Sequence, residues 1–379
     1  MGLELPNKLI RLSKSCISEA EKLAVLGVLD REYLGMGAEV QQFEQALGAF
    51  FDRQVLCVVN GTAALQLALQ AIGVGPGDEV LVPSLTYVAS FQAISATGAK
   101  PIACDIDAGT LTIDCDDAER RISERTKAIM PVHYSGGVGD LDLVYSLAKR
   151  HGLRVVEDAA HAFGTTYHDK RIGSFGDIAC FSFDGIKNIT SGEGGCITTS
   201  DPAVRRKVQD MRLLSVEKDT ENRYSGQRTW EFDVKEQGWR YHMSNIMAAI
   251  GIEQLKRFPD FAARRQHLGF LYDSMLKGHQ RICCMPNDYN SVVPHIYPVR
   301  VKALADRNAL QKKLLEKGIQ TGIHYQPNHV LSLYRDEMAS GLPATESVFS
   351  ELITLPMHAD LSDHDVGVVC KSLLSMIDR

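Results

Sequence analysis

Short apolar runs alternate with amphipathic stretches from about residue 39 to residue 199. Residues 55–59 are predicted to form a buried strand, and residues 62–72 a helix with Leu65, Leu69 and Ile72 on one face. Further strands are predicted at residues 80–82, 101–104, 128–132, 154–157, 178–183 and 196–199, and helices at 87–97 and 141–151. This alternation predicts an α/β fold, a mostly parallel sheet covered by helices on both faces.

The pattern changes after residue 199. Residues 215–237 are polar and charged, and we interpret them as a mobile or partner-contacting excursion that includes Arg228. A strong helix is predicted at residues 243–255, and after Phe258 and Pro259 the composition shifts to basic helical stretches and short strands. We therefore expect a large domain over residues 1–255, including the N-terminal segment, and a smaller C-terminal α+β domain over residues 256–379.

Composition and charge exclude several classes of protein. The chain has 379 residues, of which 45% are hydrophobic, and a net charge of −6, which argues against a nucleic-acid partner. No apolar run reaches the roughly 20 residues of a membrane span, and the start of the chain lacks the pattern of a secretory signal. Nine scattered cysteines without C-x-x-C spacing are interpreted as reduced thiols, so we expect a cytoplasmic enzyme without a structural metal.

Lys187 follows an apolar strand and precedes the turn Gly192-Glu193-Gly194-Gly195. Apolar residues at positions 181, 183, 186 and 189 crowd it, and desolvation is expected to lower the pKa of its amine. Such an amine can form a Schiff base with an aldehyde, so Lys187 is a candidate to hold pyridoxal phosphate (PLP) and to move protons. A solvated surface lysine is the ordinary alternative in a glycine-rich loop.

The run Asn60-Gly61-Thr62-Ala63 lies between a predicted strand and a predicted helix. Glycine permits a tight turn, and the free amides at the helix start favour an anion such as a phosphate. The alternative is that Thr62 only caps the helix. Ser182, five residues before Lys187, is a candidate to reach the same phosphate.

Three further side chains follow predicted strands, where ligands bind in such sheets. Asp158 is a candidate partner for a pyridine nitrogen, which it would keep protonated. Tyr87 is a candidate to stack on the same ring, and His161 to bind its phenolic oxygen. A surface acid, a half-buried tyrosine and a structural histidine are the respective alternatives.

An ordered set of motifs over nearly the whole chain resembles the DegT/DnrJ/StrS-type sugar aminotransferases, a branch of the fold type I (aspartate aminotransferase-like) PLP enzymes. The matching runs are residues 34–44, 61–65, 83–90, 157–161, 181–195, 248–255, 324–329 and 355–358. The resemblance implies a seven-stranded, mostly parallel sheet and a homodimer with shared active sites. It also implies amino-sugar biosynthesis, for example for an O-antigen or another surface polysaccharide.

The resemblance implies a role for each candidate residue. Lys187 and Asp158 would be catalytic. The cofactor would be bound by these two together with Gly61, Thr62, Ala63, Tyr87, His161, Ser182 and Arg240. Substrate would contact Glu193, His324, Tyr325 and His329. The expected reaction moves an amino group from glutamate to a nucleotide-linked keto-deoxy-sugar. The turn around Glu193 resembles the branch that acts at the 4-position, with the 3-position as the alternative.

Two positions depart from the family pattern. Arg240 stands where an asparagine reaches the neighbour's cofactor phosphate, and His242 stands in place of an arginine. Since arginine binds phosphate strongly, Arg240 is expected to take over that contact or to bind the substrate's diphosphate. A sugar dehydratase of the same superfamily would carry histidine in place of Lys187, and a regulatory relative could lose Asp158 or Lys187. Both residues are present, which argues for the aminotransferase.

Overall fold

A seven-stranded sheet forms the centre of the protein. The structure, a computed structural model, describes residues 9–227, 231–335 and 341–378. In sheet order the strands are β1 (Val55–Val58), β9 (Gly195–Thr199), β8 (Ile178–Ser182), β5 (Arg154–Asp158), β4 (Thr126–Ile129), β2 (Glu79–Pro83) and β3 (Lys100–Cys104). Strand β9 runs antiparallel to β1 and β8, and the other pairs are parallel. The predicted mostly parallel sheet is confirmed.

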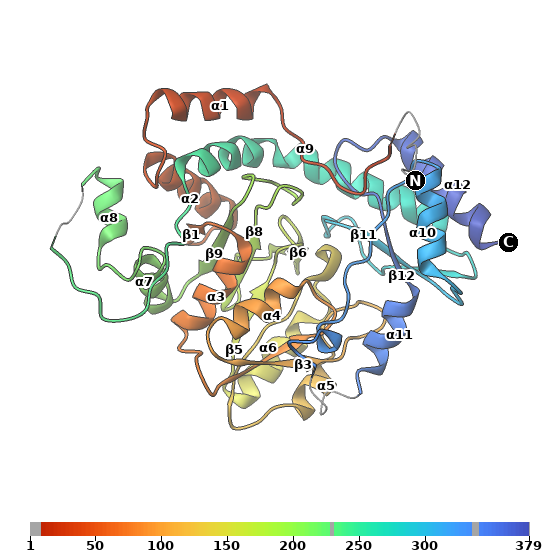
Figure 1. Ribbon diagram of the computed structural model, residues 1–379, viewed down its shortest axis with the longest axis horizontal. Helices are drawn as coiled ribbons and strands as arrows, with labels where there is room; N and C mark the ends of the chain where they lie inside the picture. Colours follow the sequence, from red (N-terminus) through yellow and green to blue (C-terminus); the bar gives the residue numbers. More distant parts are fainter. Residues whose placement is uncertain (1–8, 228–230, 336–340, 379) are drawn as a thin grey trace.

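Helices cover both faces of this sheet, as the apolar alternation predicts (Figure 1). Successive residues of a strand point to opposite faces, so in β1 Cys57 belongs to one apolar cluster and Leu56 and Val58 to the other. The Cys57 side packs against α2 (Ala38–Phe51), α6 (Leu141–His151) and α9 (Asn245–Leu276). The other side packs against α3 (Gly61–Ala71), α4 (Val88–Ser95) and α7 (Pro202–Met211).

Helix α9 is longer than its sequence predicts. Ser244 caps its start by accepting a hydrogen bond from the amide of Met247, and the helix then runs through Pro259 for 32 residues. Proline removes one helical hydrogen bond, but Phe258 and Phe261 on either side pack into the main apolar cluster and hold the helix together. The predicted boundary between residues 255 and 256 therefore lies inside a continuous helix, and the division into two domains stays a prediction.

The C-terminal region has its own sheet and apolar cluster, on the right in Figure 1. Its antiparallel strands are β10 (Ile282–Cys284), β11 (Tyr297–Val301) and β12 (Leu352–Leu355). Helices α10 (Arg307–Glu316) and α12 (Asp363–Ile377) contribute Leu314 and Val369 to its cluster, beside Val299 of β11. These elements match the predicted α+β composition.

Part of the predicted excursion is anchored to the sheet. Its helix α8 (Asp219–Tyr224) lies at the left edge of Figure 1. The hydroxyl of Tyr224 donates to Glu44 Oε2 at 2.6 Å, and the fully buried Arg212 donates to Glu44 and to the carbonyl of Cys57 in β1. The excursion also includes Arg228, which lies outside the described residues.

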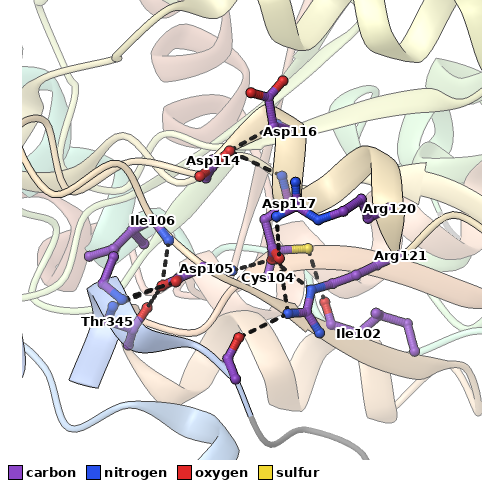
Figure 2. Close-up of polar contacts among 12 residues, drawn as sticks. Ile102, Cys104, Asp105, Ile106, Asp114, Asp116, Asp117, Arg120, Arg121 and Thr345 are labelled. Carbon is purple, nitrogen blue, oxygen red and sulfur yellow. Dashed lines mark hydrogen bonds and ion pairs between the residues drawn. The ribbon is translucent and has the colours of Figure 1, made fainter. Parts of the chain in front are cut away.

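Asp105, just after β3, joins the C-terminal region to the main sheet (Figure 2). Its carboxylate accepts hydrogen bonds from the amides of Ala344 and Thr345, at 3.0 and 2.8 Å, and from the Thr345 hydroxyl at 2.7 Å. These amides start α11 (Pro343–Glu351) and have no intrahelical partner. Asp117 of α5 (Cys115–Arg120) accepts from the Asp105 amide at 2.7 Å and pairs with Arg121.

The remaining elements are short, except for α1 (Glu19–Asp30), which lies along α9 (Figure 1). They are the hairpin β6 (Thr166–Tyr167) and β7 (Lys170–Arg171) and the 3-10 turns η1 (Tyr134–Gly136) and η2 (Asn328–Val330). All nine cysteines are free thiols. Across the described residues, no helix has the length and apolar character needed to cross a membrane.

Candidate active site

A cavity of about 460 Å³ opens at the carboxyl ends of β5 and β8. It brings together most of the residues singled out in the sequence. The predicted residues that line it are Gly61, Thr62, Tyr87, Asp158, His161, Ser182, Lys187, Glu193, His324 and Tyr325. Residues more than two hundred positions apart in the sequence thus share one site, as expected for the strand ends of an open α/β sheet.

The N-terminus of α3 forms one end of the cavity. Asn60, not Thr62, caps this helix, since its side-chain oxygen accepts from the Ala63 amide at 2.8 Å. The amides of Gly61 and Thr62 begin the helix and lack intrahelical partners. Gly61 also packs closely on Ser182, because a Cβ at this position would lie 2.9 Å from the Ser182 Cβ. The site therefore presents free amides and the Ser182 hydroxyl, which suit an anion.

Asp158 ends β5 with its carboxylate held from one side. Its Oδ2 accepts from the Ser90 hydroxyl at 2.7 Å, and its Oδ1 accepts from the Ala160 amide at 3.2 Å. The residue is 7% exposed and lines the cavity. Glu157 points to the opposite side, where it accepts from Tyr145 at 2.6 Å and lies 2.7 Å from His133 Nε2. Asp158 thus offers an oriented negative charge to a ligand.

His161 and Tyr325 form a hydrogen-bonded pair at the cavity wall. The Ser135 amide donates to His161 Nδ1 at 3.3 Å, which places the ring proton on Nε2, 3.0 Å from the Tyr325 hydroxyl. Burial holds the pKa of His161 well below its usual value, with Lys187 and His324 adding to the effect. The ring of Tyr87, whose side chain is exposed, lies 5.4 Å from that of Tyr325.

Lys187 lies at the centre of these groups. Burial lowers the pKa of its amine to about 8, while Asp158 and Asp184 raise it and Arg265 lowers it further. Its amide donates to the Asp184 carbonyl at 3.1 Å, so the turn is internally bonded. This direction agrees with the desolvation expected from its apolar neighbours. A pKa of about 8 leaves roughly a tenth of the amine neutral at pH 7, the form that acts as a nucleophile.

Two predicted substrate contacts, Glu193 and His324, line the cavity. Burial raises the pKa of Glu193 above its usual value, with Asp184 adding to the effect. His324 lies 2.9 Å, through Nδ1, from Thr354 Oγ1, and its carbonyl accepts from the Tyr134 hydroxyl. Burial lowers the pKa of His324 to about 4, so the ring is neutral at physiological pH.

Three predicted site residues lie outside the cavity lining. The Ala63 amide is already bound to Asn60. His329 is buried, with its Nδ1 2.7 Å from Ser84 Oγ and its Nε2 3.5 Å from Glu346. Arg240 is exposed on an edge segment that bridges to Leu213. These positions give His329 a structural contact within this chain and leave Arg240 available to another molecule.

The structure adds two residues to the site. His295 lines the cavity and lies 3.5 Å, through Nε2, from Lys187 Nζ. Ser90 orients Asp158 from α4. Ser90 ends one of the motif runs but was not singled out, His295 lies outside them, and the fold brings both to the site. The spacing Thr86-x-x-x-Ser90, one helical turn, is the single local signal, since their hydroxyls lie 2.9 Å apart.

The cavity fits pyridoxal phosphate. A phosphate suits the α3 N-terminus, where only glycine permits the close approach to Ser182. A pyridinium nitrogen suits the buried Asp158 carboxylate, and an aldehyde suits the Lys187 amine with its lowered pKa. Within the described ranges, no group of three or more potential ligands could hold a metal ion.

Comparison with known proteins agrees with this geometry. Residues 15–374 match the model of the DegT/DnrJ/EryC1/StrS aminotransferase family. The spore coat polysaccharide biosynthesis protein SpsC of Bacillus subtilis is 35% identical over 380 residues, 98% of each chain. A putative sugar aminotransferase of Streptococcus pneumoniae, solved in its PLP form, is 31% identical with a TM-score of 0.90, over 98% of this chain and 99% of that one. PseC of Helicobacter pylori, an aminotransferase involved in pseudoaminic acid biosynthesis, is 28% identical with a TM-score of 0.90, over 98% and 100%.

Proposed function

This chain belongs to the DegT/DnrJ/EryC1/StrS aminotransferase family, and from that premise we propose that it aminates a nucleotide-linked keto-deoxy-sugar at the 4-position. Glutamate is the proposed amino donor, and it leaves as the corresponding 2-oxo acid. The observation that carries the proposal is the placement of Lys187, with a pKa of about 8, in one cavity with Asp158. The spore coat polysaccharide relative supports a product for a surface polysaccharide.

Lys187 is the proposed nucleophile and proton carrier. When bound, PLP supplies an aldehyde that joins to amines and a ring that accepts electrons. The neutral Lys187 amine would join to this aldehyde with release of water, and after the amino donor displaces it, Nζ would carry a proton from one carbon to another. Asp158 and Asp184 stabilise the protonated amine between these steps, whereas burial favours its neutral form. The two opposing effects leave the pKa of Lys187 at about 8.

The remaining residues proposed to contact PLP bind the cofactor and orient its ring. The amides of Gly61 and Thr62 and the Ser182 hydroxyl are proposed to hold the phosphate. The Asp158 carboxylate, fixed by Ser90, would hold a proton on the ring nitrogen of bound PLP. His161 carries its proton on Nε2 and can direct it to a phenolic oxygen if the Tyr325 hydroxyl turns away. The exposed Tyr87 ring offers a stacking surface.

Glu193, His324 and Tyr325, which line the cavity, are proposed to contact the sugar. His324 is neutral and Glu193 has a raised pKa, so both can exchange hydrogen bonds with sugar hydroxyls without a fixed strong charge. His329 supports this wall from behind through Ser84.

A panel of substrates tests this proposal. Purified protein with PLP and glutamate is incubated with nucleotide-linked 3-keto- and 4-keto-6-deoxy-sugars, and products are identified by mass spectrometry and NMR. We expect an amino group at C4 and one equivalent of 2-oxoglutarate per product. Amination at C3 would show that the enzyme acts at the 3-position and not at the proposed 4-position. The absence of any aminated product would overturn the proposal.

Arg240 is proposed to serve the active site of a second copy in a homodimer. Tyr241 accepts from the Val59 amide at 2.7 Å, which fixes the Arg240 segment beside the start of α3. The rings of Trp239 and Tyr241 stack on each other. Their side chains form hydrogen bonds with Gln70 and Gln66 of α3, so Arg240, which lies between them in the sequence, points away from that helix.

An exposed apolar stripe on α1, formed by Leu23, Leu26 and Leu29, also supports dimerisation. The cytoplasmic location stays a prediction.

His242, the second departure from the family pattern, lies on the same side as Arg240. Burial lowers its pKa to about 4, and Arg223, Arg240 and Arg212 add to the effect. A neutral imidazole between three guanidinium groups avoids a fourth positive charge at this point. This explains why histidine is tolerated where the family carries arginine.

Mixed dimers test the role of Arg240. Arg240→Ala is expected to weaken the binding of PLP or of the nucleotide-sugar by about tenfold or more, because a charge-assisted phosphate contact is lost. When R240A and K187A subunits are mixed, each alone being impaired, one hybrid site has both residues, and activity should recover. Unchanged affinities in R240A, or no recovery in the mixture, would contradict a role in the partner's site. Lys235→Ala, at an exposed position in the same excursion, is the control.

A further inference from the structure

His295 contacts Lys187 from a distant part of the chain. The two residues are 108 positions apart, and His295 Nε2 lies 3.5 Å from Lys187 Nζ. His295 is 3% exposed, and its ring lies 4.5 Å from the ring of His161. Within the described residues its other nitrogen, Nδ1, has no hydrogen-bond partner. A buried imidazole therefore has one nitrogen directed at the amine.

The main chain of His295 is held on both sides. Its amide donates to the Ser135 carbonyl at 3.2 Å, and its carbonyl accepts from Arg265 Nη1 at 3.0 Å. The same nitrogen of Arg265 donates to the Pro294 carbonyl at 3.2 Å. Arg265 belongs to the long helix α9 and is only 2% exposed. This clamp fixes the point from which the imidazole reaches Lys187.

The surroundings of His295 keep its ring neutral. Burial holds its pKa well below its usual value, and the neighbouring Lys187, His161, Arg265 and His324 add to the effect. Arg265 donates to the Pro294 and His295 carbonyls, and its positive charge disfavours a second positive charge on the His295 ring. A neutral imidazole can accept one hydrogen bond, and an ammonium group only donates. The contact with protonated Lys187 therefore has a single arrangement, with Nε2 as the acceptor.

We propose that His295 is a positioning residue that accepts a hydrogen bond from the protonated Lys187 amine. The inference rests on the proposed role of Lys187 in amino transfer. That reaction requires the amine to carry a proton for part of each cycle and then to release it. A neutral acceptor stabilises the ammonium group modestly, whereas a carboxylate at the same point would hold the proton more strongly. The hydrogen bond to His295 also fixes the direction of Lys187 Nζ between the two proton transfers.

Two substitutions of similar polarity separate positioning from packing. In His295→Gln, the side-chain amide extends to the place of Nε2, and the hydrogen bond can be kept. In His295→Asn, the amide reaches only to the place of Nδ1, and the hydrogen bond is lost. The pKa of Lys187 is measured in the cofactor-free protein, from the pH dependence of its reaction with acetic anhydride followed by peptide mass spectrometry. Asp158, Asp184 and Arg265, the other charged groups that act on Lys187, are unchanged in both variants.

We expect H295N to lower the pKa of Lys187 by about one unit, because a hydrogen bond to a charged group is lost. H295Q is expected to retain a pKa near the wild-type value. In the PLP-loaded enzyme, kcat should fall by about tenfold in H295N and less in H295Q, with KM for the amino donor unchanged. His267→Asn, at an exposed position of α9, is the control and should alter neither value.

An unchanged or raised pKa of Lys187 in H295N, or equal pKa values in H295N and H295Q, would overturn the proposal. The labelling experiment needs no substrate and no cofactor, so it remains decisive if the wild-type enzyme aminates none of the sugars tested. In that case the proposed function fails while the contact between His295 and Lys187 is still judged on its own. Thermal unfolding of each variant shows whether the comparison is made between folded proteins.

Discussion

Replacing Lys187 with alanine is expected to reduce amino transfer by a factor on the order of 10⁴ or more, because nucleophile and proton carrier are lost together. PLP should still bind through the residues around α3 and Asp158, but not covalently. The measurement is borohydride reduction followed by peptide mass spectrometry. Wild-type protein should carry the reduced cofactor on the peptide that contains Lys187, and the variant should carry none.

Lys187→Arg is the matched variant for this test. Arginine keeps the positive charge but stays protonated, so it cannot act as the nucleophile. K187R should therefore be as inactive as K187A while retaining more of the stability of the folded protein. Substantial activity in either variant, or a cofactor attached to another lysine, would contradict the assignment.

Replacing Asp158 with asparagine is expected to lower kcat by a factor of about 10² to 10³, the range seen when one preorganised electrostatic contact is removed. The amide is close in shape to the carboxylate but cannot hold a proton on the ring nitrogen. Asp158 also raises the pKa of Lys187. In D158N that pKa should fall below about 8, and the acidic limb of the pH–rate profile, along which Lys187 loses its proton and becomes active, should shift to lower pH. Stopped assays from pH 6 to pH 10 measure both effects.

Ser90→Ala separates the charge of Asp158 from its orientation. This variant removes the 2.7 Å hydrogen bond to Oδ2 but keeps the carboxylate. A smaller fall in kcat than in D158N is expected, with little change in the pH profile. If S90A and D158N lowered kcat equally without any shift in pH dependence, the charge of Asp158 would not be the active feature.

The sheet and its chemistry follow from local patterns in the sequence. Residues 55–58 are all apolar, which predicts a strand buried on both faces, and the structure places Leu56 and Cys57 in separate clusters. Strand-end residues such as Asp158 and Lys187 could be recognised because parallel strands end at a common edge. The roles assigned to these residues stay predictions, but their common location was predictable.

Other parts of the site depend on contacts that no local pattern encodes. His295 lies 108 positions from Lys187 in the sequence, and the Arg265 clamp on the Pro294 and His295 carbonyls helps to hold it there. The length of α9 was underestimated because Pro259 ordinarily ends a helix, and the packing of its neighbours outweighs that tendency. His329 matched a motif, yet its ring is bound to Ser84, a partner 245 positions away.

Asp105 helps to separate a segment that can vary in sequence from the residues proposed to bind the cofactor. It fixes one end of the stretch that carries His324 and Tyr325, and pairing of Gly322 with Thr354 fixes the other end. Lys187, Asp158 and Ser182 all lie outside those two anchors. Substitutions or length changes between the anchors can therefore reshape the wall proposed to meet the sugar while Lys187, Asp158 and Ser182 keep their positions, whereas His161 is coupled to this stretch through Tyr325. Substitutions in this stretch can therefore change which sugar is accepted without changing Lys187, Asp158 or Ser182.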